Sequence, residues 1–188
     1  KRTGYSNNSL RLNVTHKVND RINMAWTNSF VNSSADRSIA NNDNTGVSLP
    51  IQTLTTPPYI DFHPDDKGNY PDPVHGANPL QIIDLMTNNE KVNRYITGMN
   101  FNAILQQSQI SITKFAARAG LDYYHQKGQV LFPANLTYEI DRGFGGRNVQ
   151  GNASETSSSW AGFLVNTLTP NPDLTFVTTA GLTHEYGN

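Results

Sequence analysis

Six segments of the chain alternate between hydrophobic and polar residues with a period of two, the pattern of a strand with two different faces. In the first segment, Leu10, Leu12 and Val14 alternate with Arg11 and Asn13. The segments are longer than the strands of soluble proteins, which average about 5 or 6 residues. A tilted membrane strand needs about 9 to 11 residues to cross. The alternation predicts strands over residues 9–18, 21–32, 91–106, 109–126, 156–169 and 173–186.

The two sides of these predicted strands differ in chemistry. Candidates for a lipid-facing surface are Leu10, Leu12, Val14, Met24, Trp26, Phe101, Phe115, Leu121, Phe176 and Leu182. Candidates for a surface that faces a watery lumen are Arg11, Asn13, Arg94, Asn100, Lys114, Arg118 and Asp122. A basic group on the lipid side of a membrane strand costs roughly 2 to 4 kcal/mol at the midplane, so charges belong on the other side.

Two details complete the strand pattern. In segment 156–169 both sides carry apolar residues, with Trp160 and Leu164 opposite Phe163, so the pattern assigns its sides only weakly.

Aromatic residues near strand ends predict interfacial girdles, because their rings are amphipathic. These residues are Tyr95, Tyr123, Trp160 and Tyr186.

The connections between the predicted strands alternate in length. Short turns are expected at 19–20, 107–108 and 170–172, whereas the connections 33–90 and 127–155 are long. Short turns on one rim and long loops on the other are typical of an outer-membrane barrel, whose long loops are extracellular. In a soluble domain, a loop of nearly 60 residues would count against the strand assignment.

The connection 33–90 divides into two parts. Its first part is rich in Asn and Pro and predicts no regular strand. Its second part predicts a short helix from residue 78 to about 89, with Asn78 as N-cap and Pro79 at the first helical position. Leu80, Ile83 and Met86 would share one face of that helix.

Composition narrows the class of protein. Only 36% of the 188 residues are hydrophobic, and no run of about 18 apolar residues predicts a spanning helix. Charged residues make up 15%, below the roughly 25% of soluble domains. A barrel wall with one face toward lipid and one toward water explains why the chain is polar and yet has few charged residues. A secreted β-sandwich shares this composition, so composition alone does not separate the two.

Charge and cysteine content exclude several kinds of function. The formal net charge of -1 gives no reason to expect a nucleic-acid partner. The absence of cysteine excludes disulfide frameworks, thiolate metal sites and cysteine nucleophiles.

Few motifs suggest chemistry. The residues Asp61, His63, Asp65 and Asp66 cluster but do not match a calcium loop, so a solvated acidic loop is expected. The histidines His16, His63, His75, His125 and His184 lack the spacing of a zinc protease. The Gly-rich segment 143–147 lacks the Lys and Ser or Thr of a phosphate loop and predicts a flexible extracellular tip. We therefore expect no enzyme, no cofactor and no metal.

Short motifs follow one another in an order that matches a known family. They are Tyr5-Ser6-Asn7-Asn8 before Leu10-Arg11-Leu12-Asn13, Pro57-Pro58-Tyr59, Gly68-Asn69-Tyr70, Asn78-Pro79-Leu80, Val92-Asn93-Arg94-Tyr95, Ala119-Gly120-Leu121-Asp122-Tyr123 and Phe132-Pro133. In order and spacing, over nearly all 188 residues, the chain resembles the SusC/RagA-type TonB-dependent transporters of Bacteroidota.

The resemblance implies a fold and a function. Members of that family are 22-stranded outer-membrane barrels with an N-terminal plug, preceded by a segment that contacts TonB. The chain opens with Lys1-Arg2-Thr3-Gly4 and has no Met or signal peptide, so we expect an internal piece of about six antiparallel strands without the plug. The implied function is import of oligosaccharides, peptides or similar nutrients. No ligand-binding residue transfers from the family.

The resemblance also implies partners and a location. The expected partners are a SusD-like surface lipoprotein, TonB through the missing N-terminal region, and outer-membrane lipid. The expected location is the bacterial outer membrane, crossed many times.

Two alternatives stay open. The chain could belong to a structural SusC-like subunit of a larger outer-membrane complex. It could instead be a soluble β-sandwich that binds carbohydrate, in which case its apolar faces would bury each other within the 188 residues.

Overall fold

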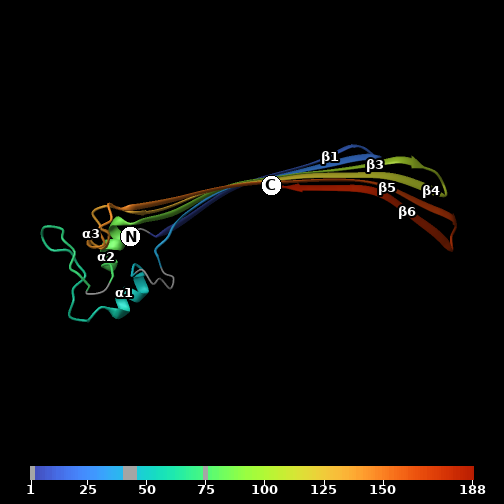
Figure 1. Ribbon diagram of the computed structural model, residues 1–188. Coiled ribbons are helices and arrows are strands. Elements are labelled where there is room, and N and C mark those ends of the chain that lie inside the picture. Colours follow the sequence, from blue (N-terminus) through green and yellow to red (C-terminus); the bar gives the residue numbers. More distant parts are fainter. Residues whose placement is uncertain (1–2, 40–45, 74–75) are drawn as a thin grey trace. The chain divides into compact units, whose positions relative to one another are not determined.

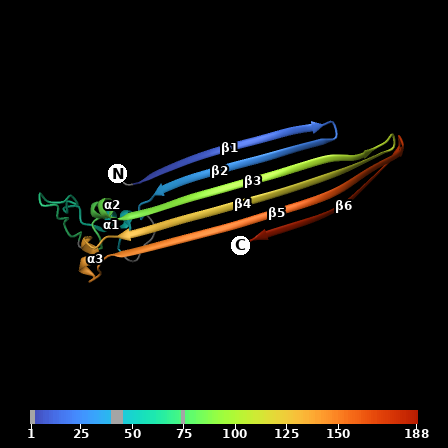
Figure 2. The same ribbon diagram turned by 90° about the horizontal axis from the view of Figure 1, so that it is seen from above.

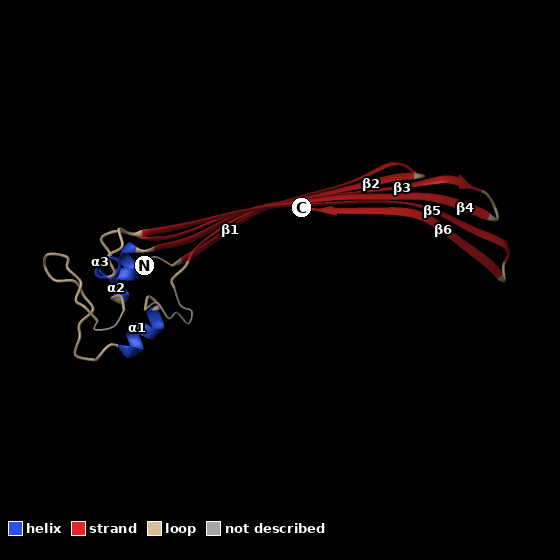
Figure 3. Cartoon of the chain, in the orientation of Figure 1, coloured by secondary structure: helices blue, strands red, loops and turns tan. Residues whose placement is uncertain are grey.

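The computed structural model describes residues 3–39, 46–73 and 76–188, and strands dominate it (Figure 1). The first half contains β1 (Gly4–Asn19), β2 (Ile22–Asp36), α1 (Leu49–Thr55) and α2 (Pro79–Leu85). The second half contains β3 (Thr87–Gln107), β4 (Ser111–Phe132), α3 (Thr137–Asp141), β5 (Arg147–Asn171) and β6 (Leu174–Gly187). Figure 3 distinguishes the long strands from the three short helices, which lie in the two long connections.

The strands form one antiparallel sheet in the order β1-β2-β3-β4-β5-β6, so each strand pairs with its neighbour in sequence. Figure 2 shows them side by side in this order. The predicted all-β class and six antiparallel strands are confirmed. The sheet is not closed, because β1 and β6 are its two edges, so the described residues do not form a barrel by themselves.

The strands are longer than the alternation predicts at the ends next to the long connections. The third was expected from residue 91 and begins at Thr87, and the fifth was expected from residue 156 and begins at Arg147. These extensions are mostly polar, and ladder hydrogen bonds join backbone groups whatever the hydropathy of the side chains. Hydrophobic periodicity therefore ends earlier than the strands do.

The last turn also differs from its prediction. A turn was expected over 170–172, but Pro170 belongs to β5, and the turn consists of Pro172 and Asp173. The register between β5 and β6 shifts between Leu168 and Asn171, which gives β5 one extra residue there. A bulge of this kind accommodates a proline that has no N–H for the ladder.

The chain divides into two compact units, which are described separately. Unit 1 comprises Lys1–Asn7, Ser33–Val92 and Gln126–Asn152, and it contains the three helices. Unit 2 comprises Asn8–Asn32, Asn93–His125 and Ala153–Asn188, and it contains strands and short turns only.

Unit 1 has a small hydrophobic core. Its buried members are Val47, Ala77, Ile82, Met86, Phe132, Leu136 and Tyr138. Burial of one large apolar side chain contributes roughly 1.5 to 3 kcal/mol, so this core stabilises the long connections. The short helix α1 within it was not predicted.

The start of α2 was predicted correctly. The side chain of Asn78 accepts hydrogen bonds from the backbone N–H of Leu80, at 2.9 Å, and of Gln81, at 3.2 Å. The helix ends at Leu85, earlier than expected. The buried residues of the helix are Pro79, Gln81 and Ile82. Of the three residues of the predicted apolar face, Met86 is buried just after the helix, whereas Leu80 and Ile83 are only half-buried.

Within the Gly-rich segment 143–147, residues 143–145 are exposed, whereas Gly146 and Arg147 pack within unit 1. The flexibility and the extracellular position expected of this segment stay predictions. Arg147 Nε donates to both carboxylate oxygens of Glu139, at 3.0 and 2.9 Å, and the Glu139 side chain is fully buried. The Arg147 guanidinium also stacks on Phe132, 4.6 Å from the ring centroid. Gly146 has φ +89° there, and a Cβ on it would lie 2.9 Å from the backbone N of Ala134. The ion pair joins residues eight positions apart, which local sequence patterns do not reveal.

Candidate functional site

Side-chain contacts in unit 2 define the first face of the sheet. The rings of Phe101 and Phe115 pack with centroids 6.2 Å apart. A Cβ on Gly162 would contact the Phe115 ring, and Gly162 pairs with Leu182. Trp26 Nε1 donates to Thr97 Oγ1 at 3.0 Å, which adds β2 to the same side.

Other contacts define the opposite face. Arg94 Nε donates to Asp122 Oδ1 at 2.9 Å, and the Arg118 guanidinium lies 5.7 Å from the centroid of the Phe163 ring. Asn102 Nδ2 donates to Asn23 Oδ1 at 3.2 Å. Thr15 and Lys17 of β1 line one hollow together with Asn23, Asn102 and Lys114, which puts the odd-numbered residues of β1 on this side.

These contacts and strand alternation give each face a simple definition within unit 2. The apolar face carries the even-numbered residues of β1, β2, β5 and β6 and the odd-numbered residues of β3 and β4. The polar face carries the others. All ten predicted lipid-facing residues lie on the apolar face, and all seven predicted lumen-facing residues lie on the polar face. Which medium meets each face stays a prediction.

Charge separates the two faces completely in the strands of unit 2. On the apolar face these strands carry no Asp, Glu, Lys or Arg. The charged strand residues are all on the polar face: Arg11, Lys17, Arg94, Lys114, Arg118, Asp122, Glu155 and Glu185. The fifth strand, whose sides the sequence left open, has Trp160 and Leu164 on the apolar face and Phe163 on the polar face.

The apolar face is uncovered among the residues described for unit 2. Leu10 is 70% exposed, Phe176 51% and Leu182 72%. Figure 1 views these strands nearly edge-on and shows a single layer. The buried hydrophobic residues of unit 2 are Ala103 and Ala161, both small. Soluble monomers rarely expose so large an apolar surface, which marks a contact with a membrane or a partner.

The apolar face has a defined extent along each strand. Its apolar residues cover 10–18, 22–30, 95–105, 115–123, 160–168 and 174–182. From residue 115 to 123 is nine residues and from 95 to 105 is eleven, which matches the 9 to 11 or so that span a bilayer core. Asn166, a polar residue inside this band, is satisfied by donating to Ser111 Oγ at 3.1 Å and Thr113 Oγ1 at 2.8 Å.

Aromatic residues with polar partners lie near the ends of the band that continue toward the long connections. Tyr95 donates its hydroxyl to Asn28 Oδ1 at 2.8 Å. The rings of Trp160 and His184 lie 5.8 Å apart. Tyr123 and Tyr186 belong to the same face. All four predicted girdle residues therefore share the apolar face, and such amphipathic rings suit a boundary between hydrocarbon and water.

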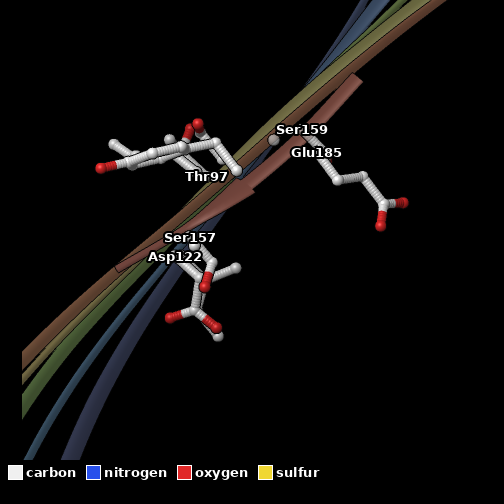
Figure 4. A pocket seen from close by; sticks show the side chains of 11 residues that line it. Thr97, Asp122, Ser157, Ser159 and Glu185 are labelled. Carbon is white, nitrogen blue, oxygen red and sulfur yellow. The ribbon is translucent and has the colours of Figure 1, made fainter. Parts of the chain in front are cut away.

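A hollow of about 500 Å³ lies where β6 ends, lined by Asp122, Ser157 and Glu185 among others. Figure 4 shows Asp122 and Ser157 on one side of the sheet and Thr97 on the other. The hollow thus lies open at the sheet edge with residues from both faces, and it does not enclose a ligand. No ligand-binding residue is assigned from it.

Two acidic residues of the first long connection, Asp61 and Asp65, each form a local turn. Asp61 accepts a backbone hydrogen bond from His63 at 3.0 Å, which lowers the pKa of Asp61. Asp65 accepts from the side chain of Asn69 at 3.0 Å and from its backbone N–H at 2.8 Å, which lowers the pKa of Asp65. Over the described ranges, no three His, Cys, Asp or Glu residues lie together as a metal site. His75 lies outside those ranges.

None of the helices in the part of the chain that the structure describes is long and apolar enough to cross a membrane. A comparison of the chain with protein-family models finds no match, and a search among curated proteins finds none either.

Proposed function

We propose that this chain is part of the wall of a bacterial outer-membrane β-barrel, and that the barrel is a TonB-dependent transporter of the SusC/RagA type. One observation carries the barrel assignment, whereas the SusC/RagA type rests on the order of the sequence motifs. In unit 2, a single sheet has one uncovered face without formal charge, opposite a face that holds every charged strand residue. Lipid on the first face and water on the second match this division.

The open edges of the sheet support a larger barrel. β1 and β6 have no second neighbour, so their outer N–H and C=O groups lack strand partners within the sheet. Each unsatisfied backbone group in hydrocarbon costs several kcal/mol, and only closed sheets avoid that cost. Six strands in a membrane therefore need further strands beside both edges, as a 22-stranded barrel would provide.

The polar face suits the wall of a hydrated lumen. Its arginine and carboxylate pair, Arg94 and Asp122, lies among hydroxyl and amide side chains. Such a wall allows passage of hydrophilic nutrients, and the proposed cargo is an oligosaccharide, a peptide or a similar molecule. The proposed role is transport and not catalysis. A SusD-like lipoprotein and TonB are the proposed partners of the whole protein.

A soluble β-sandwich is less well supported, because it needs a second layer over the apolar side chains. The described residues form one sheet, and Leu12 is 54% exposed and Leu182 72% exposed on its apolar face.

Purification of the full-length protein from native membranes tests the proposal. We expect recovery only with detergent, a change of electrophoretic mobility on boiling, copurification of a SusD-like lipoprotein, and TonB-dependent uptake of its cargo. Recovery as a monodisperse protein without detergent would contradict the membrane assignment. If the protein is recovered in a large outer-membrane assembly and supports no uptake, the transporter proposal is contradicted and the structural SusC-like subunit is favoured.

A further inference from the structure

A hollow of about 670 Å³ lies on the polar face of unit 2, where β1 to β4 approach the short turns. Two of the residues that line it, Lys17 of β1 and Lys114 of β4, have long side chains. Shorter side chains line it on the strands between them, Asn23 of β2 and Asn102 of β3. The sequence of long and short side chains across neighbouring strands therefore creates the hollow, which we call the basic hollow.

The basic hollow carries more positive than negative charge. Its lining holds the cations Lys17, Arg21 and Lys114 and the carboxylate of Asp20, and three cations with one carboxylate leave a net formal charge of +2. Lys17 Nζ pairs with Asp20 Oδ1 at 2.6 Å, so this carboxylate already has a partner. Among the residues that the structure describes, neither Arg21 nor Lys114 forms an ion pair.

The other carboxylates of unit 2 lie away from the basic hollow. Asp122 follows Lys114 by eight residues in β4, which is about 26 Å along the strand. Glu155 and Glu185 lie near Asp122, since each of them lines a hollow together with it. Asp173 is in the last turn, and β5 runs from the basic hollow at residue 165 to residue 171, about 20 Å, before that turn. The positive charge of the hollow is therefore not offset by the rest of the polar face.

The uncharged part of the lining suits a sugar. Asn102 Nδ2 donates to Asn23 Oδ1 at 3.2 Å, which leaves the amide N–H groups of Asn23 as donors for a ligand. Thr15 adds a hydroxyl group and Ile104 an apolar side chain. A sugar ring has hydroxyl groups around its edge and C–H groups on its two sides, so it matches amide, hydroxyl and apolar groups together. The two cations favour a sugar that also carries carboxylates.

We propose that the basic hollow binds a carboxylated oligosaccharide, with Arg21 and Lys114 on its carboxylates and Asn23 on its hydroxyl groups. This inference rests on the proposed function, because the polar face must line the lumen for cargo to reach it. It narrows the cargo from hydrophilic nutrients to sugar acids. An exposed ion pair contributes up to about fivefold in affinity, so the two cations contribute up to about 25-fold.

The test measures binding of a trimer of galacturonic acid to the full-length protein in detergent by isothermal titration calorimetry. The methyl ester of the same trimer is the uncharged counterpart. At low salt the acid should bind more tightly than the ester, and Arg21→Gln/Lys114→Gln should weaken binding of the acid by up to about 25-fold and leave binding of the ester unchanged. The conservative variant Lys114→Arg keeps the charge and should keep the binding.

The matched control is Arg11→Gln, which removes a cation of the same polar face that does not line the basic hollow. It should bind the acid as the wild type does. The change of electrophoretic mobility on boiling shows for each variant that it is folded.

Equal binding of the acid by the wild type and the double variant would overturn the inference, as would equal binding of the acid and the ester. Hexaglutamate carries carboxylates without a sugar ring and should bind more weakly than the trimer; equally tight binding would show that any polyanion is accepted and would refute the sugar acid. A nitroxide label at residue 101 tests the membrane assignment separately. If the label is in lipid but the acid is not preferred, this inference alone fails, and if the label is not in lipid, the proposed function fails with it.

Discussion

Replacement of Phe101 by arginine places a charge in the middle of the apolar band of β3. Phe101 lies six residues after Tyr95 and four before Leu105, and its ring packs on Phe115 with centroids 6.2 Å apart. A lipid-facing arginine near the midplane costs about 2 to 4 kcal/mol, and loss of the aromatic pair adds about 0.5 to 1.5 kcal/mol. We therefore expect Phe101→Arg to destabilise the folded protein by about 2.5 to 5.5 kcal/mol.

The matched control is Asn100→Arg, one residue earlier in the same strand. Asn100 is on the polar face, where Arg94 and Arg118 already lie. An arginine in water at this point should change stability by no more than about 0.5 kcal/mol.

The assay unfolds the full-length protein from lipid vesicles with denaturant and measures the free energy of unfolding. The fraction of heat-modifiable protein in native outer membranes is a second readout. Equal effects of Phe101→Arg and Asn100→Arg would refute the reasoning, because both faces would then meet the same medium. A larger effect of Asn100→Arg would reverse the assignment of the faces.

Three further predictions concern unit 1. Arg147→Met leaves the buried Glu139 carboxylate without its counter-ion and should lower the free energy of unfolding by about 3 to 5 kcal/mol. Amide hydrogen exchange over 134–146 should become faster, and unchanged protection there would contradict the prediction. Asn78→Ala removes the cap of α2 and should cost about 0.5 to 2 kcal/mol, seen as faster exchange at residues 80 and 81 but not in β6. The hydrogen bonds from Asn69 lower the pKa of Asp65, so they stabilise the turn above the usual carboxyl range and are lost as the pH falls through the lowered pKa. A carboxyl-carbon NMR titration of Asp65 should give a midpoint below the usual value, and a midpoint at or above it would contradict the turn geometry.

The faces of the strands were predictable from the sequence because side-chain alternation is a local property of a strand. Leu10, Leu12 and Val14 fall on one side of β1 wherever its partner lies. The start of α2 was predictable for the same reason, since Asn78 caps the two residues that follow Pro79.

Features that depend on distant partners could not be predicted. The sides of β5 are one example, because Trp160 and Phe163 are both aromatic and the local pattern does not rank them. The pairing with β6 shows which side each ring takes, since Phe163 lies opposite Gly181, which leaves room for its ring. A Cβ on Gly181 would lie 2.4 Å from Phe163 Cδ1.

The packing of the long connections was missed for a similar reason. The pair of Arg147 with Glu139 depends on a loop that brings the two residues together, and the start of β5 there is polar. Hydrophobic periodicity therefore predicts neither this ion pair nor the early start of β5. The candidate site itself was clearer, because the exclusion of Asp, Glu, Lys and Arg from one face of the strands of unit 2 follows from the local alternation of the sequence.

The most direct test of the central claim is a nitroxide scan along β3 of the full-length protein in lipid vesicles, from residue 95 to residue 105. Oxygen concentrates in lipid and a charged nickel complex stays in water, so relaxation by each reports the medium around every label. We expect collision with oxygen at the odd-numbered residues and with nickel at the even-numbered ones, alternating with a period of two. Odd-numbered residues that meet nickel as readily as their neighbours, or that are shielded from both agents, would contradict it.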